Sequence, residues 1–235
     1  MKKTAVLLAA LVTGAVLRAD EAPVAPATPS YTVTVDFPYV SSYVFRGLKL
    51  ADDAIQPSIK VAAGSAYAGV WLSEPIDSEF DSEIDFYGGY SFALSGGWAV
   101  DVGATIYHYP ELDTSGGAED TTVEGYVGLT GALGGVTLGG YVYQDFTLEI
   151  TTLQGSLGYS IPLGEKLNAN FTGTLGYVTP DSGDEYTYYG ASVQFPYKIS
   201  DSSTLTVGGS YANHDDVPGY EHDNVWVNIG FTYTF

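Results

Sequence analysis

The sequence predicts an all-β fold, an antiparallel up-and-down transmembrane β-barrel of about twelve strands. Three observations predict it. Apolar and polar residues alternate with period two over most of the chain from Tyr31 onward, short and long connections follow one another between the strands, and the chain ends on an aromatic residue, Phe235. No segment after residue 30 sustains a helical period.

The composition fits a barrel better than a bundle of membrane-spanning helices. Apolar residues make up 45% of the 235 residues, yet the mean hydropathy is only +0.06 because they are spread along the chain. The one long apolar run, Thr4 to Leu17, is too short to cross a bilayer as a helix. The chain has no cysteine, so an exported form is held together by packing and backbone hydrogen bonds rather than by disulfides.

The first 30 residues are predicted to lie outside the barrel. Lys2 and Lys3 precede the apolar run and Ala19 follows it, which is the pattern of a cleaved secretory signal peptide over residues 1–19. Three prolines disfavour helix and strand over residues 20–30, which indicates a periplasmic linker. Residues 31–235 then form the barrel. An N-terminal membrane anchor is the alternative interpretation of the first segment.

The last strand shows the alternation most clearly. Val225, Val227 and Ile229 share one face, which suits lipid, whereas Trp226 and Asn228 share the other, which tolerates water. The same pattern predicts strands over Tyr31 to Arg46, Ile55 to Ala63, Ala66 to Ser73, Glu83 to Phe92, Trp98 to Tyr107, Val123 to Leu129, Val136 to Val142, Leu153 to Tyr159, Leu167 to Tyr177, Tyr189 to Phe195, Leu205 to Tyr211 and Asn224 to Phe235. We expect the last of these to close the barrel against the first.

The connections predict how the barrel is oriented. Periplasmic turns are short and extracellular loops are long in outer-membrane barrels. Short connections occur near Gly64 and at Gly134-Gly135, while longer ones occur near Glu74 to Ser82 and Pro110 to Asp120. An even number of strands then places both termini on the periplasmic side of the outer membrane.

The C-terminal residues predict how the chain reaches the membrane. Phe235 is terminal and Tyr233 stands two positions before it, a pattern that resembles the recognition signal for the barrel-assembly machinery. Aromatic residues such as Trp98 and Tyr159 also lie near predicted strand ends, where rings prefer the headgroup level. The expected partners are therefore outer-membrane lipids and the assembly machinery. The sequence leaves the oligomeric state open.

A family resemblance follows from the first half of the chain. It is carried by Ser42 to Gly47, Gln56-Pro57, Tyr67 to Ser73, Glu83 to Tyr90, and Asp101 to Gly103 with Tyr107 to Pro110. These segments resemble TorF-type porins, a family of bacterial outer-membrane barrels. The resemblance is good from about Tyr31 to Val142 and departs from the family pattern at Ser42 and at Leu48-Lys49. It implies a pore-like barrel in the outer membrane.

The charge distribution predicts which solutes a pore would favour. The formal net charge is −20, and most of the 28 acidic residues fall in predicted long loops, among them Asp52, Glu83, Glu111, Asp145 and Glu185. Such a field concentrates cations, although acidic loops also serve solubility or bind divalent ions at lipid headgroups. From strand parity we predict that Arg46, Lys60, Asp85, Asp101, Glu124, Tyr107, Tyr126 and Tyr141 line the pore, and that Tyr87, Tyr143 and Tyr188 also face inward, either to stack on sugar rings or to fill a narrow barrel.

The sequence therefore predicts a porin-like channel for passive diffusion of small neutral or cationic solutes. The alternative is a closed structural or adhesin-like barrel whose acidic loops act outside the cell. A lipid-modifying enzyme pairing Ser73 or Ser91 with His108 is disfavoured, because strand geometry alone places many serines near some histidine in a barrel. A metal site at His214 and His222 is disfavoured because their spacing matches no ligand motif. We expect no catalytic residue, no cofactor and no metal. The acidic charge excludes nucleic acid as a partner.

Overall fold

The computed structural model describes residues 31–77, 80–215 and 217–235. The expected signal peptide and linker, residues 1–30, lie outside the described residues. Within these ranges no helix is long and apolar enough to cross a membrane.

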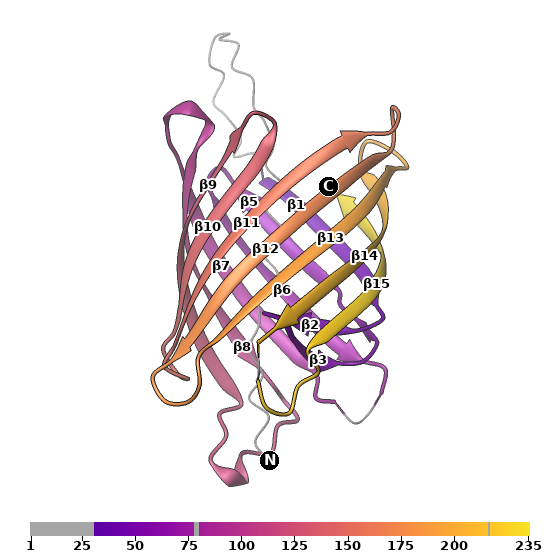
Figure 1. The fold of residues 1–235 in the computed structure, drawn as a ribbon. Helices are drawn as coiled ribbons and strands as arrows, with labels where there is room; N and C mark the ends of the chain where they lie inside the picture. Colours follow the sequence, from indigo (N-terminus) through magenta and orange to yellow (C-terminus); the bar gives the residue numbers. More distant parts are fainter. Residues whose placement is uncertain (1–30, 78–79, 216) are drawn as a thin grey trace.

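Twelve antiparallel strands close into one barrel, as the sequence predicts (Figure 1). Each strand pairs with the next along the chain, and the last returns to the first, where Thr34 lies opposite Thr234 and Val40 opposite Asn228. Closure leaves no sheet edge for lipid to contact. The wall strands are β1 (Tyr31–Val40), β4 (Ala54–Ile55) with β5 (Ser58–Ala63), β6 (Ala66–Pro75), β7 (Glu83–Ala93), β8 (Ala99–His108), β9 (Thr121–Leu133), β10 (Val136–Asp145), β11 (Ile150–Pro162), β12 (Asn168–Pro180), β13 (Tyr186–Lys198), β14 (Ser203–His214) and β15 (Asp223–Thr234).

Two of these short segments make up one strand. β4 and β5 both pair with β1 on one side and β6 on the other, and only Gln56 and Pro57 separate them. Proline has no N–H for the ladder, so a break in the pairing there is expected.

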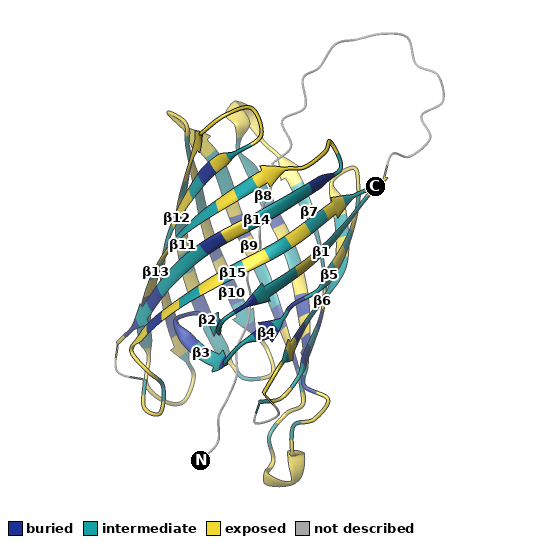
Figure 2. Cartoon of the chain, turned by 90° about the vertical axis from the view of Figure 1, so that its right-hand side faces the viewer, coloured by how far each residue is buried: buried dark blue, intermediate teal, exposed yellow. Residues whose placement is uncertain are grey.

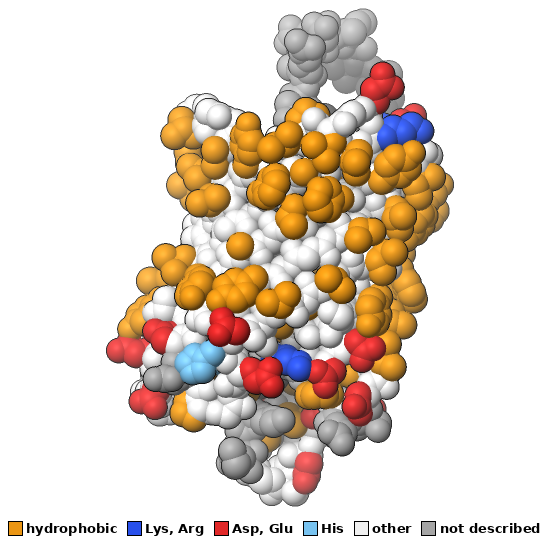
Figure 3. Space-filling view, turned by 45° about the vertical axis from the view of Figure 1, so that its right-hand side comes forward, with side chains coloured by type: hydrophobic (Ala, Val, Ile, Leu, Met, Phe, Trp, Pro, Cys, Tyr) orange, Lys and Arg blue, Asp and Glu red, His pale blue; other side chains and the backbone are white. Residues whose placement is uncertain are grey.

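Alternation along each strand sorts side chains between the outer and inner faces of the wall. In β15, Val225, Val227 and Ile229 are exposed on the outside while Asn224 is buried and Asn228 half-buried inside. Figure 2 shows exposed and less exposed residues alternating along the strands in the same way. On the face drawn in Figure 3, apolar side chains lie mainly in an upper and a lower zone of the wall, and most of the acidic side chains gather at its lower end.

The two ends of the barrel differ in their connections. At one, here called the short-turn end, the strands are joined by residues 64–65, 94–98, 134–135, 163–167 and 199–202. At the long-loop end they are joined by residues 41–53, 76–82, 109–120, 146–149, 181–185 and 215–222. The predicted alternation is therefore present, except that β10 and β11 extend so far that only residues 146–149 remain between them. Strand β1 begins at the short-turn end, and β15 ends there (Figure 1).

The prediction of a single strand from Tyr31 to Arg46 is wrong. The wall strand ends at Val40, and the chain turns inward to form a separate hairpin of β2 (Tyr43–Phe45) and β3 (Leu48–Ala51). Ten residues already suffice for a tilted strand to cross the bilayer, so nothing requires β1 to continue. Residues between Leu48 and Ala51, expected in an outer loop, instead lie in this hairpin, which we call the plug hairpin.

Candidate functional site

The plug hairpin turns at Arg46 and Gly47. Both residues have positive φ, 43° and 84°, and Phe45 pairs with Leu48, so this is a two-residue hairpin turn with the twist that antiparallel strands favour. Glycine adopts this conformation freely, but an arginine there costs about 1–3 kcal/mol. A strained residue at the tip of a hairpin indicates that its side chain is held by strong contacts elsewhere.

Those contacts lie across the interior of the barrel. The Arg46 guanidinium donates two hydrogen bonds of 2.9 Å to the Glu124 carboxylate on β9, which is a bidentate ion pair. On the opposite wall, Asn224 donates to the Gly47 carbonyl oxygen over 3.1 Å. The hairpin therefore reaches from β1 to both β9 and β15, and it narrows the interior at the long-loop end.

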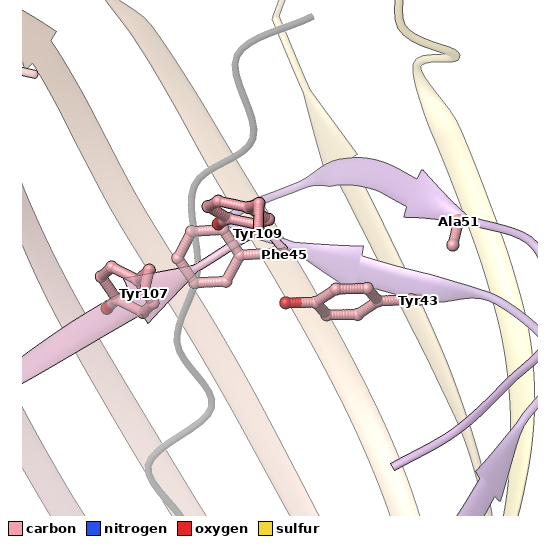
Figure 4. Close-up of a cluster of buried hydrophobic side chains, with 5 residues drawn as sticks. All are labelled: Tyr43, Phe45, Ala51, Tyr107 and Tyr109. Atoms are coloured by element: carbon pink, nitrogen blue, oxygen red, sulfur yellow. The ribbon is translucent and has the colours of Figure 1, made fainter. Parts of the chain in front are cut away.

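A buried aromatic cluster supports the hairpin. Tyr43, Phe45 and Ala51 of the hairpin pack with Tyr107 and Tyr109 from the end of β8, as Figure 4 shows. The Tyr43 and Tyr109 hydroxyls both donate to the Glu83 carboxylate, over 3.1 and 2.9 Å. The hairpin is thus anchored to the wall by two carboxylates, Glu83 and Glu124.

The surroundings of Arg46 form a cation-binding box, defined here as Glu124, Tyr107, Tyr143 and Phe45. The Tyr107 hydroxyl donates to Glu124 over 3.0 Å, which orients the carboxylate. The guanidinium carbon lies 4.7 Å from the Phe45 ring centroid and 4.8 Å from that of Tyr143, so aromatic faces cover the cation. The Arg46 and Glu124 side chains are 2% and 0% exposed, which removes the pair from water.

Carboxyl groups outnumber basic groups around this box. Asp85 is fully buried, and neither of its carboxylate oxygens has a hydrogen-bond partner. Asp145, directly opposite Glu124 in the sheet, accepts from the backbone N–H groups of Thr147 and Leu148 through Oδ1, while its Oδ2 has no partner. Buried polar atoms are usually satisfied, so unpartnered carboxylate oxygens mark a place suited to a cation.

A second group of polar side chains lies further toward the short-turn end. We call it the tyrosine girdle, and it consists of Lys60, Tyr67, Asp101, Tyr126 and Tyr141. The Tyr67 hydroxyl donates to both carboxylate oxygens of Asp101 over 2.9 and 3.0 Å, and Tyr141 donates to the same group over 3.3 Å. The hydroxyls of Tyr67 and Tyr126 are 2.6 Å apart. The Lys60 amino group lies 4.7 Å from the Tyr67 ring centroid.

The girdle tyrosines lie against the wall because inward glycines make room for them. A Cβ added to Gly128 would be 2.2 Å from the Tyr141 ring, and one added to Gly103 would be 2.3 Å from the Tyr126 hydroxyl. The glycines in mid-strand thus permit close approach of a ring from the neighbouring strand. Rings packed on the wall leave more of the interior free than rings that point across it.

We expect Gly128→Ala to lower the free energy of unfolding by about 1–3 kcal/mol, because the new methyl group displaces the Tyr141 ring. The control is Gly140→Ala on the outer face of β10, where an added Cβ would meet nothing within 4 Å. Urea unfolding of both variants in detergent micelles measures the difference. Equal stability of the two variants would contradict this role for Gly128.

The eight residues predicted to line a pore all face the interior and fall into two groups. Arg46, Asp85, Tyr107 and Glu124 belong to the constriction at the plug hairpin, and Lys60, Asp101, Tyr126 and Tyr141 belong to the tyrosine girdle. The sequence reasoning missed Glu83 and Asp145, which it placed in outer loops. Both are buried on the inward face, Glu83 as the first residue of β7 and Asp145 because β10 continues three residues beyond its predicted end at Val142.

The other predicted residues have these locations. Tyr233 and Phe235 lie on the outer face, 38% and 74% exposed, so their role as an assembly signal stays a prediction. The Ser73 hydroxyl accepts a hydrogen bond from Gln56, and His108 Nδ1 lies 3.0 Å from the Thr121 hydroxyl, so these two do not form a catalytic pair. Ser91 on β7 lies opposite Asp101, which is near the start of β8, whereas His108 is the last residue of β8.

His214 and His222 stack on each other with ring centroids 5.2 Å apart. Both ring nitrogens of His214 face backbone carbonyl oxygens, those of Asp215 at 2.8 Å and Glu221 at 3.0 Å. These contacts fix the loop after β14. Over the described ranges, no group of three or more His, Cys, Asp or Glu side chains has a geometry that could hold a metal ion.

A family model described as Gcw_chp, bacterial protein of unknown function, matches residues 24–208. The chain belongs to this family. No curated protein matches it. The match covers most of the barrel, including the plug hairpin and every residue of the cation-binding box.

Solved structures share the fold. A NanC porin superposes with a TM-score of 0.57 at 14% identity, over 86% of this chain and 98% of its own. A KdgM porin in complex with disordered oligogalacturonate gives 0.59 at 10%, over 87% and 99%. The COG4313 outer membrane channel from Pseudomonas putida F1 gives 0.50 at 12%, over 90% and 97%. The predicted porin-like barrel is thereby confirmed as the fold, while the narrower resemblance to TorF-type porins stays a prediction.

Proposed function

We propose that this chain is a porin-like channel of the outer membrane that lets small neutral or cationic solutes diffuse passively. The observation that carries the proposal is the interior of a closed barrel that is mostly polar and has several carboxyl groups beside the plug hairpin. Its inward carboxyl groups include Asp36, Glu83, Asp85, Asp101, Glu124 and Asp145, whereas the basic side chains of the described wall strands and plug hairpin, apart from Lys198 at the short-turn end, are Lys60, Arg46 and Lys49, and Lys49 pairs with Asp52. Arg46 is neutralised by Glu124.

This charge balance argues for a different solute class from that named for one structural neighbour. KdgM has been solved with oligogalacturonate, which is an acidic sugar polymer. An interior with excess carboxylate repels such a polymer and concentrates cations. Shared fold does not transfer the ligand, because solute choice depends on the side chains inside the barrel.

The same proposal includes the orientation of the barrel. The short-turn end, where β1 begins and β15 ends, faces the periplasm, and the acidic long-loop end faces the cell exterior. Apolar side chains on the outer face contact outer-membrane lipids, and the exposed Tyr233 and Phe235 serve the assembly machinery. The arrangement of Ser73, Ser91 and His108 supports no catalytic role for these residues.

A closed structural or adhesin-like barrel is the second candidate, and the plug hairpin favours it. Around the hairpin, Tyr107 and Asp85 are at most 1% exposed, so the outer part of the interior is tightly filled along β7 and β8. The two candidates differ in whether ions pass.

Reconstitution of the purified chain in planar bilayers separates these candidates. A channel gives discrete current steps, and an acidic constriction gives a reversal potential displaced toward the cation equilibrium potential in a salt gradient. Raising the salt concentration should weaken this selectivity, because salt screens the interior carboxylates. Bilayers that stay silent at all protein concentrations would favour the closed barrel.

A further inference from the structure

We propose that the cation-binding box is a recognition site for solutes carrying a guanidinium or primary ammonium group, and that Arg46 is a tethered occupant which such solutes displace. This inference rests on the proposed channel function and names the class of cation that the channel selects. The hairpin turn itself does not require an arginine at this position, because such turns favour a residue such as asparagine or glycine.

The box already supplies what a guanidinium group needs. Glu124 accepts two parallel hydrogen bonds, and Tyr107 holds that carboxylate in place. The rings of Phe45 and Tyr143 lie within 4.8 Å of the cation and replace water around it. Because these groups are all buried, the ion pair lacks the solvent screening that weakens surface pairs.

A second carboxyl group lies beside the box. Asp85 lies directly opposite Tyr107 across β7 and β8, and both of its carboxylate oxygens are buried without a hydrogen-bond partner. The Arg46 guanidinium donates both of these hydrogen bonds to Glu124 and neither of them to Asp85. A free cation that is not tied to the hairpin is able to use both carboxylates, either together or in succession.

The tether makes the present occupant displaceable. Arg46 holds a left-handed backbone conformation at φ 43°, and release of its side chain lets that strain relax. The hairpin is otherwise held to the wall by its aromatic cluster and by polar contacts, chiefly Tyr43 to Glu83 and Asn224 to Gly47. A cationic solute that takes over Glu124 therefore also loosens the segment that narrows the pore.

The test uses Arg46→Gly in planar bilayers, because glycine keeps the turn while it empties the box. We expect millimolar methylguanidinium to block the current through this variant, and the native channel to need at least about tenfold more, since Arg46 competes for the same carboxylate. Tetramethylammonium, which has no N–H donor, should block neither. The block should disappear in Arg46→Gly/Glu124→Gln and persist in Arg46→Gly/Asp101→Asn, which removes a carboxylate of the tyrosine girdle.

A second readout does not depend on current. Millimolar methylguanidinium should raise the thermal stability of Arg46→Gly in detergent and leave that of Arg46→Gly/Glu124→Gln unchanged. Equal block of the native and Arg46→Gly channels, or block that follows Asp101 instead of Glu124, would overturn the inference. Absence of current from every variant would contradict the channel function itself, and in that case a missing stability gain for Arg46→Gly would overturn the inference independently.

Discussion

Glu124→Ala is expected to lower the free energy of unfolding by about 3–5 kcal/mol, because it leaves the Arg46 guanidinium buried without its counterion. Both side chains are almost fully shielded from solvent, so water does not replace the lost carboxylate. The Tyr107 hydroxyl would also lose its acceptor. Urea unfolding in detergent micelles, followed by tryptophan fluorescence, measures the change.

Two further variants show whether the loss arises from the ion pair. Arg46→Gly/Glu124→Ala removes both charges and should be more stable than Glu124→Ala alone, since no stranded guanidinium remains. Asp201→Ala, whose carboxylate pairs with Lys198 at the short-turn end but is 97% exposed, should stay within about 0.5 kcal/mol of the native chain. A Glu124→Ala variant as stable as Asp201→Ala would show that the buried pair does not hold the hairpin.

Replacing residues 43–51 by a glycine-serine segment of the same length is expected to raise the single-channel conductance. The substitution removes the β2 and β3 side chains that lie inside the barrel while the wall strands keep their pairing. The control replaces residues 113–117, an exposed part of the long loop before β9. Single-channel recordings compare the three proteins in the same bilayer.

The hairpin substitution is informative in both directions. A conductance equal to that of the native chain would show that the hairpin does not set the narrowest part of the path. An increase of the same size in the loop control would assign the constriction to the outer loops instead. If the native chain carried no current while the hairpin variant did, the plug hairpin would be shown to close the channel.

The wall of the barrel was predictable from the sequence because one rule governs every strand. Each residue faces either lipid or the interior, so a period of two appears directly in the residue types, as at Val225 and Trp226. The same parity placed Asp85, Asp101 and Glu124 on the inner face. The pairing of the last strand with the first followed from closure of an even-stranded barrel.

The plug hairpin could not be predicted in the same way. Residues 43–51 alternate much as a wall strand does, and their inward position depends on partners far along the chain, above all Glu124 and Asn224. The one local signal was Arg46-Gly47, since a residue followed by glycine between two apolar runs is typical of a two-residue hairpin turn. Glu83 and Asp145 were missed because acidic residues at strand ends resemble loop residues.

The reversal potential of the native chain in a potassium chloride gradient tests the central claim most directly. The account predicts discrete current steps whose reversal potential lies on the potassium side, moves toward zero as salt rises, and shifts toward the chloride side when Asp36 and Asp101 are both changed to asparagine. A reversal potential on the chloride side, or one that ignores both carboxylates, would contradict a cation-preferring pore.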